Sequence, residues 1–224
     1  MKVRVAVVGA GGRLGAVAAR AVEASAQFEL VARIERGMEL VAELQGSRAE
    51  LALDATEAGL GARHARLMLE NGVRPVIGTS GVSPSEAQSL NQLAVERGLG
   101  GLIVPNFSLG IVLLEQAARD AARHYAACEL IEMHHERKKD APSGTALHLG
   151  RELAAVRGGA EIPIHSVRLP GLYAHQLAIF GAPGETYTLR HDMSGPEGFA
   201  PGILAALRHA RTARGIAVGL VHAL

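Results

Sequence analysis

The feature that most constrains the fold is a glycine-rich turn directly after the first apolar run. Residues 3–8 read Val-Arg-Val-Ala-Val-Val, and Gly-Ala-Gly-Gly-Arg-Leu-Gly follows at 9–15. A run that is apolar on both faces is typical of a buried parallel strand. Glycine permits the sharp turn and close backbone approach that such a strand needs before a helix. The pattern therefore predicts a strand, a turn and a helix over residues 3–24.

Strand-like and helix-like segments continue to alternate through the first hundred residues. We expect further strands at 28–34, 51–54, 75–78 and 101–104, and helices at 14–24, 62–70 and 84–97. Ser83 suits the N-cap of the last helix, and Pro84 suits its first position. Repeated strand–helix units indicate an α/β fold with a doubly wound parallel sheet of the Rossmann type.

The pattern changes after residue 105. We expect helices at 108–125, 143–157 and 198–213, strands at 129–133, 164–169, 172–180 and 185–191, and an apolar tail at 216–224. Consecutive strands favour a mixed or antiparallel sheet. The expected organisation is a dinucleotide-binding domain at 1–105 and a smaller α+β domain for substrate binding and oligomerisation at 106–193. Residues 194–224 form a C-terminal helix and tail that return to the first domain.

Composition excludes several classes of protein. The 224 residues are 48% hydrophobic, which is enough for a normal core, and a net charge of +1 gives no reason to expect a nucleic acid or a membrane surface as partner. Charges interrupt every apolar run well before the ~20 residues that span a bilayer. The single cysteine, Cys128, excludes an internal disulfide framework and fits a reducing cytosol, where it would be a small buried hydrophobe.

The glycine turn has the chemistry of a nucleotide site. Gly9, Gly12 and Gly15 follow a G-x-x-G-x-x-G spacing, although Leu14 breaks the stricter G-x-G-x-x-G pattern. Such a turn brings a pyrophosphate to the positive end of the following helix. Glu35 ends the second strand about twenty residues later, where an acid can accept both ribose hydroxyls. A tight turn without a ligand and a solvated charge at a strand end are the alternatives.

Further loops are expected around the same ligand. Arg36 could pair with a 2′-phosphate that Glu35 would repel, which argues for tolerance of both NADH and NADPH. Arg13 is expected near the cofactor phosphates, unless it is solvated at the helix start. The Gly78-Thr79-Ser80-Gly81 and Asn106-Phe107 segments follow strands at the carboxyl edge of the sheet, where we expect them to surround the nicotinamide rather than form ordinary turns.

Residues 134–145 read His-His-Glu-Arg-Lys-Lys-Asp-Ala-Pro-Ser-Gly-Thr. Histidine carries a proton near neutral pH, and lysine supplies a cation or an acid. In an extended segment His134 and His135 point to opposite faces, so they are expected to do different work. No metal is expected, because the spacing is not H-E-x-x-H and no Cys or carboxylate cluster accompanies the pair. Two solvated histidines before a charged loop are the other alternative.

The end of this segment starts a helix. Unpaired N–H groups in the first turn, together with the Thr145 hydroxyl, form a site of the size of a carboxylate. An N-cap explains Ser143 but not Gly144, because glycine costs a helix about 1 kcal/mol. A bare backbone that a ligand can approach accounts for Gly144.

Taken in order along nearly the whole chain, these motifs resemble the 4-hydroxy-tetrahydrodipicolinate (dihydrodipicolinate) reductase family of the diaminopimelate and lysine pathway. The matching segments are Gly-Ala-Gly-Gly-Arg-Leu-Gly, Gly-Thr-Ser-Gly, Pro-Asn-Phe-Ser-Leu-Gly and Glu-Met-His-His-Glu-Arg-Lys-Lys-Asp-Ala-Pro-Ser-Gly-Thr-Ala. The resemblance implies a cytoplasmic homotetramer that uses NADH or NADPH. It implies that a cyclic dicarboxylate loses water, accepts a hydride from the nicotinamide and takes up a proton, with cations near Lys138 stabilising negative charge.

The resemblance also implies residue roles. His134 matches the acid/base histidine and Lys138 the proton donor, while His135, Gly144 and Thr145 match substrate contacts. The implied cofactor contacts are Gly9, Ala10, Gly11, Gly12, Arg13, Leu14, Glu35, Arg36, Gly78, Thr79, Ser80, Val104, Pro105, Asn106 and Phe107.

The chain departs from the family pattern at Glu136, at Lys139 and in two longer stretches. The stretch between Glu35 and Leu51 is compressed, and the usual Ser-x-Arg before Phe-Ala-x-Gly is replaced by Ser194-Gly195-Pro196-Glu197-Gly198. A missing arginine there puts substrate affinity in doubt more than reaction type.

Two alternative functions remain open on the sequence. One is another two-domain NAD(P)-dependent oxidoreductase, such as a semialdehyde, homoserine or sugar dehydrogenase. An acylating semialdehyde dehydrogenase would need a nucleophilic cysteine, whereas Cys128 precedes a strand rather than a helix start. The other is a nucleotide-binding protein without catalysis, which would need neither His134 nor Lys138.

Overall fold

The computed structural model describes all 224 residues, which form two compact units. The first unit consists of Met1–Ser108 and Phe199–Leu224, and the second of Leu109–Gly198. These limits lie a few residues from the boundaries expected at 105 and 193. No helix of either unit has the length and apolar character needed to cross a lipid bilayer.

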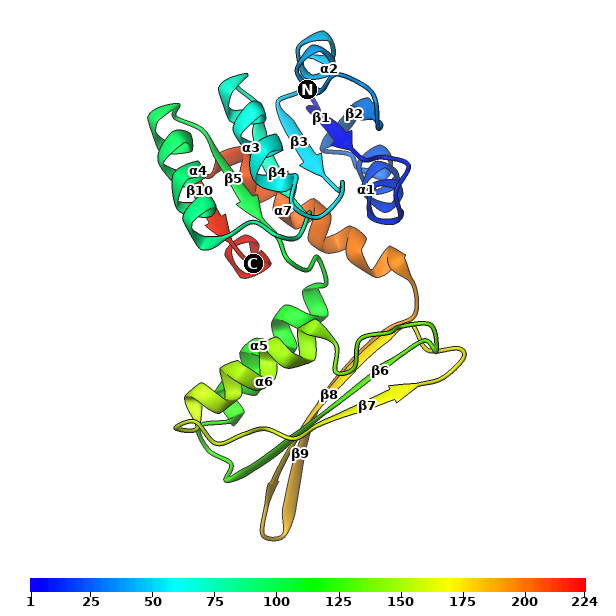
Figure 1. The fold of residues 1–224 in the computed structure, drawn as a ribbon, viewed down its shortest axis with the longest axis vertical. Coiled ribbons are helices and arrows are strands. Elements are labelled where there is room, and N and C mark those ends of the chain that lie inside the picture. The colour runs from blue at the N-terminus through cyan, green and yellow to red at the C-terminus, as the bar shows by residue number, and fades with distance from the viewer. The chain divides into compact units, whose positions relative to one another are not determined.

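The first unit is built around a six-stranded parallel sheet in the order β10-β5-β4-β3-β1-β2 (Figure 1). Its strands are β1 (Val3–Val8), β2 (Phe28–Ile34), β3 (Leu51–Asp54), β4 (Arg74–Ile77), β5 (Gly100–Ile103) and β10 (Gly215–Val218). Its helices are α1 (Arg13–Ala24), α2 (Leu40–Ser47), α3 (Gly61–Glu70), α4 (Pro84–Glu96) and α7 (Ala200–Thr212), with a 3₁₀ turn at Leu220–Ala223. The parallel, Rossmann-like sheet confirms the fold class expected for this part of the chain.

Helices cover both faces of this sheet. Helices α1 and α7 pack against each other, and α7 runs across β3, β4 and β5. Helices α2, α3 and α4 pack on the other face, where Leu44, Met68 and Leu90 join Val8 in one buried cluster. Burial on both faces is the reason why these strands read as continuous apolar runs.

Helix α2 and strand β10 were not predicted from the sequence. Helix α2 buries only Leu40 and Leu44, carries a glycine, and ends at Arg48 in the left-handed conformation with φ of 51°. Its apolar pattern is therefore too weak to stand out. Strand β10 is four residues long, and it pairs with β5, more than a hundred residues earlier in the chain. The sequence pattern around residues 215–218 does not indicate a pairing partner so far away in the chain.

The strand order places a topological switch point between β1 and β3, because β1 pairs with β2 on one side and β3 on the other. Loops that follow these two strands diverge at the carboxyl edge, which is where open α/β sheets bind ligands. Gly9 begins the turn after β1 with φ of 77°. A Cβ on Gly15 would lie 2.0 Å from the Gly9 carbonyl oxygen, so only glycine lets α1 start this close to the strand.

The second unit contains a four-stranded mixed sheet in the order β7-β6-β8-β9, in which only β6 and β7 run parallel. Its elements are α5 (Leu109–Ala121), β6 (Ala127–His134), α6 (Gly144–Val156), β7 (Ile164–Arg168), β8 (Ala174–Ala182) and β9 (Glu185–Met193), and a 3₁₀ turn spans Pro196–Phe199 at its end. Figure 1 shows α5 and α6 side by side on one face of the sheet. The core between these two helices and the sheet contains Leu114, Leu130, Leu153 and Phe180. The mixed sheet confirms the expected fold class of this part.

Candidate active site

A cavity of about 650 Å³ lies in the first unit at the switch point. Six of its lining residues are among those expected to bind a cofactor: Gly9, Gly12, Arg13, Leu14, Glu35 and Arg36. The other lining residues were not predicted as cofactor contacts: Val8, Ile34, Gly37, Met38, Leu40, Ala55, Thr56, Glu57, Leu60 and His64. The cavity thus joins the loops that follow β1, β2 and β3.

The start of α1 is free to receive an anion. Its N-cap is Gly12, which makes no side-chain capping bond, and the first turn contains no acidic residue. The first amides of a helix have no acceptor within the helix, and the aligned peptide dipoles make this end positive. A phosphate or diphosphate group is the kind of anion that such a helix start binds.

Two charged residues that line the cavity, Glu35 and Arg36, directly follow β2. The Glu35 carboxylate lies against the glycine turn, because a Cβ on Gly11 would be 3.0 Å from its Oε2. The Arg36 guanidinium forms an ion pair with the exposed carboxylate of Glu57. The pair of Arg36 and Glu57 could not be predicted from the sequence, since Glu57 belongs to a different loop.

A buried carboxylate, Asp54, ties together the loops that follow β3 and β4. His64 Nδ1 lies 2.6 Å from its Oδ2, and the hydroxyls of Thr56 and Thr79 each donate to its Oδ1 at 2.6 Å. Burial raises the pKa of Asp54, but the hydrogen bonds from His64, Thr56 and Thr79 outweigh it and hold the pKa below its usual value. Thr79 was expected at the nicotinamide, and its hydroxyl is engaged by Asp54.

The remaining residues expected around the nicotinamide do not line this cavity. Gly78 is closely packed, because a Cβ there would lie 2.6 Å from the Phe107 ring and 3.1 Å from Leu14. The segments that follow β1, β4 and β5 therefore meet at Leu14, Gly78 and Phe107. Of the others, Val104 is buried, Asn106 Oδ1 accepts the Ser108 amide, and Ser80 and Pro105 are exposed.

In the second unit, the centre of the candidate site is Glu132, a fully buried carboxylate on β6. Arg168 at the end of β7 binds it with both guanidinium nitrogens, at 2.7 and 2.9 Å. His134 Nδ1 lies 2.6 Å from its Oε2, and the Ser143 amide donates to its Oε1 at 3.2 Å. Burial raises the pKa of Glu132, but bonds from Arg168, Ser166 and His134 keep it below the usual value. Glu132 is therefore ionised and can only accept.

This arrangement fixes the state of His134. Because Glu132 only accepts, the proton must lie on Nδ1 of His134, and Nε2 of the neutral ring carries a lone pair. Burial lowers the pKa of His134 below its usual value of 6.5, and the charges of Lys138 and Arg168 act in the same direction, against the opposing effect of Glu132. At neutral pH His134 is thus poised to accept a hydrogen bond or a proton.

The loop after β6 carries the expected lysine. Lys138 Nζ donates to both oxygens of Asp140, at 2.8 and 2.9 Å, and the Lys138 amide closes a turn on the His135 carbonyl. Arg168 holds this loop as well, by a 2.7 Å bond to the Asp140 carbonyl oxygen. The Nδ1 atom of His135 is buried and has no partner within the chain. His134 and His135 therefore have different surroundings.

Helix α6 begins directly beside Glu132. Its N-cap Ser143 accepts the Ala146 amide at 3.2 Å, while the amides of Gly144 and Thr145 have no acceptor in the chain. Gly144 is exposed, and a Cβ placed on it would meet no atom within 4 Å. Packing within the protein does not explain this glycine.

Sequence reasoning missed Glu132, Arg168 and Gln176. In the alternating pattern of β6, Glu132 shares its face with Leu130 and His134, so an acid at an inward position was the available signal. Gln176 is opposite Glu132 in the β6–β8 register and buries an amide nitrogen without a partner. Arg168 belongs to this group only through the β6–β7 pairing, which a single sequence does not reveal.

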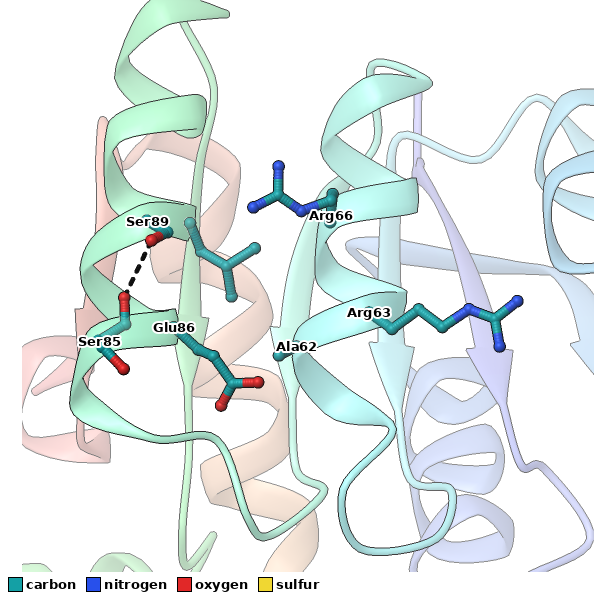
Figure 2. A pocket seen from close by; sticks show the side chains of 7 residues that line it. Ala62, Arg63, Arg66, Ser85, Glu86 and Ser89 are labelled. Carbon is teal, nitrogen blue, oxygen red and sulfur yellow. Dashed lines mark hydrogen bonds between the residues drawn. The ribbon is translucent and has the colours of Figure 1, made fainter.

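A shallower groove of about 390 Å³ lies between α3 and α4 of the first unit. Figure 2 shows Arg66 directed toward α4 and Arg63 directed away from the groove. The Glu86 carboxylate is engaged by the Ser83 amide and hydroxyl in a capping box, and Ser89 donates to the Ser85 carbonyl. The groove contains none of the residues expected at a site. No group of three His, Cys, Asp or Glu side chains is arranged to hold a metal ion.

A Rossmann-like unit with an open anion cradle, and a second unit with an oriented histidine, a lysine and a bare helix start, define the class of two-domain nicotinamide-dependent reductases. Within that class, the chain belongs to the dihydrodipicolinate reductase family. The model of the family's N-terminus matches residues 3–107, and that of its C-terminus matches residues 110–224.

Individual relatives agree with this assignment. The 4-hydroxy-tetrahydrodipicolinate reductase of Geobacillus kaustophilus is 38% identical over 100% of both chains. The solved structure of a dipicolinate-bound dihydrodipicolinate reductase from Paenisporosarcina superposes with a TM-score of 0.93 at 32% identity, over 100% of both chains. An amine dehydrogenase from Mycobacterium smegmatis shares only the fold, at 12% identity and a TM-score of 0.69 over 97% of this chain and 95% of its own.

The cysteine also argues against an acylating semialdehyde dehydrogenase. Cys128 is buried on β6 among Leu130 and Phe180, and this burial raises its thiol pKa to about 11. A nucleophilic cysteine needs a lowered pKa and access to substrate, and Cys128 has neither.

The Glu132 network yields a stability prediction. Arg168→Met should lower the free energy of unfolding by about 3 kcal/mol, because it leaves a buried carboxylate without its main partner. The matched control is Arg190→Met, which breaks an exposed pair with Asp192 and should cost less than about 1 kcal/mol. Urea unfolding measures both. A double variant, Glu132→Gln with Arg168→Met, should lose less than Arg168→Met alone, and equal losses for the two arginine variants would contradict the network.

Proposed function

We propose that the chain is a 4-hydroxy-tetrahydrodipicolinate reductase of lysine biosynthesis, the activity for which its full-length relatives are named. The observation that carries this proposal is the convergence in the second unit of an open helix start, an oriented neutral histidine and a lysine. Those three groups can bind a carboxylate, accept a hydrogen bond and donate a proton. Members of this family use NADH or NADPH.

The cofactor would be held by the cavity of the first unit. The α1 start would bind the diphosphate, Glu35 would accept the ribose hydroxyls next to Arg36, and the turn from Gly9 to Leu14 would let the backbone come close. The segments Gly78–Ser80 and Val104–Phe107 would surround the nicotinamide. When bound, the reduced nicotinamide supplies the hydride.

One substrate carboxylate would bind at the start of α6. Two free amides at Gly144 and Thr145, the Thr145 hydroxyl and the positive helix end together match a carboxylate. The empty space where a Cβ of residue 144 would lie gives the ligand room to approach. The buried, unpartnered Nδ1 of His135 is a further polar contact for the substrate.

Lys138 and His134 would have different roles at the step in which the substrate takes up a proton. Neutral His134 offers only the Nε2 lone pair, so it accepts a hydrogen bond from the substrate and cannot be the main acid at neutral pH. Lys138 would supply the proton, and two hydrogen bonds to the Asp140 carboxylate hold its ammonium group in place. The same cations would stabilise negative charge that develops on the substrate.

The family resemblance also supports a homotetramer that forms through the sheet of the second unit. Ile131, Met133, Leu177 and Ile179 lie on the sheet face that α5 and α6 do not cover, and each is only partly buried. A second copy of the chain would cover them. A cytosolic location fits the use of reduced nicotinamide cofactors and the lone reduced cysteine.

The proposed reaction is tested by following dihydronicotinamide absorbance with substrate made freshly by the preceding synthase. The unaltered chain should oxidise NADH or NADPH only when this substrate is present. Lys138→Met should lower kcat by about 10²-fold and leave cofactor affinity unchanged, because the acid is lost while the cofactor site is intact. Lys139→Met is the control and should keep most activity, since Lys139 is exposed and has no bonded partner. Turnover of homoserine or a sugar in place of this substrate would contradict the proposal.

The carboxylate site gives a second test. Gly144→Ala should weaken the binding of pyridine-2,6-dicarboxylate about tenfold or more, because the new methyl group would occupy the space of the ligand. The same change should leave the melting temperature unchanged or raise it, because alanine favours a helix and meets no protein atom. Calorimetric titration and thermal unfolding measure the two effects. An unchanged dicarboxylate affinity would remove Gly144 from the site.

A further inference from the structure

Three charged side chains from two loops border one end of the cofactor cavity. Glu35 and Arg36 follow β2, and Glu57 follows β3. All three line the cavity and are exposed to solvent. They therefore face whatever group occupies this end of a bound dinucleotide.

The two cofactors differ at one point, a phosphate on the 2′-oxygen of the adenosine ribose. An acid at the end of the second strand accepts the hydroxyls of that ribose, and Glu35 lies in this position against the glycine turn. A 2′-phosphate carries up to about two negative charges at neutral pH. It would meet the Glu35 carboxylate, and it needs a cation to offset that repulsion.

Arg36 is the cation at this position, but Glu57 is already paired with it. The other arginine that lines the cavity is Arg13, the first residue of α1. With two carboxylates and one guanidinium, the ribose end carries a net negative charge. A 2′-phosphate can reach Arg36 only by displacing Glu57, whose carboxylate would still lie close by.

The pair adds little to the stability of the fold. Its side chains are 85% and 68% exposed, and ion pairs between such exposed groups contribute little. The pair instead affects the choice of ligand. A fixed charge that repels only one of two competing ligands lowers the affinity for that ligand alone, even where the attraction within the pair is weak. NADH lacks the phosphate and does not experience this repulsion.

We propose that Glu57 is a determinant of cofactor specificity, which selects NADH over NADPH by neutralising Arg36 and repelling the 2′-phosphate. This inference rests on the proposed function and deepens it, because the sequence alone indicated only that both cofactors are tolerated.

The test is the equilibrium affinity for each cofactor, measured without substrate by dihydronicotinamide fluorescence and by calorimetry. The unaltered chain should bind NADH about tenfold more tightly than NADPH. Glu57→Gln keeps the size of the side chain and removes its charge. It should tighten NADPH binding about tenfold and change NADH binding less than about twofold. The gain should shrink at high salt, which screens exposed charges.

Two further variants isolate the mechanism. Glu70→Gln makes the same change in net charge at the exposed end of α3, outside the cavity, and should not alter the preference. Arg36→Ala in the Glu57→Gln background should abolish the gain, because Arg36 is the group that the phosphate would bind. Circular dichroism checks that each variant is folded.

The outcomes separate this inference from the proposal on which it rests. Equal affinity of the unaltered chain for both cofactors, or equal shifts of both in Glu57→Gln, would overturn the role of Glu57 and leave the reductase proposal intact. If neither NADH nor NADPH binds to the unaltered chain, the proposed function and this inference are overturned together.

Discussion

The candidate active site depends on one buried charge, the carboxylate of Glu132. A charge that is removed from water must be paired and fully hydrogen-bonded. Arg168, His134 and the Ser143 amide meet that requirement, and each belongs to a different part of the second unit. Satisfying one carboxylate therefore fixes the end of β7, the imidazole of His134 and the start of α6 relative to one another. Pre-organisation of this kind keeps catalytic groups in place before the substrate arrives.

The first unit also contains a buried, fully hydrogen-bonded carboxylate, which lies next to the cofactor cavity. Asp54, also fully buried, holds His64 Nδ1 at 2.6 Å and the hydroxyls of Thr56 and Thr79. These partners come from the loops after β3 and β4 and from α3, so the bonds hold in place two residues that line the cavity, Thr56 and His64. Each unit thus has an acid at or near the carboxyl end of a strand that orients a histidine. In the second unit that histidine lies beside Lys138 in the candidate site, whereas in the first it lines the cofactor cavity.

Local pattern predicted most of the fold. Each of these features has a sequence pattern that is confined to a few neighbouring residues: the buried parallel strands, the glycine turn and the capped start of α4. Their positions could therefore be predicted from the sequence. Helix α2 and strand β10 could not, because the first is short with two buried leucines and the second depends on a remote partner. The same reasoning applies to the site. His134, Lys138 and Gly144 lie in one recognisable segment, whereas Arg168 and Glu57 gain their roles from residues that are distant along the chain.

The central claim is that His134 is neutral at about pH 7 because burial lowers its pKa, and that the hydrogen bond to Glu132 holds its proton on Nδ1. The ¹⁵N spectrum of the imidazole tests this directly, recorded on the unaltered chain with isotope-labelled histidine and assigned by comparison with His134→Asn. The account predicts a neutral ring at about pH 7, with the proton on Nδ1 and titration only below the usual value of 6.5. A ring that is protonated on both nitrogens at neutral pH, or neutral with its proton on Nε2, would contradict it.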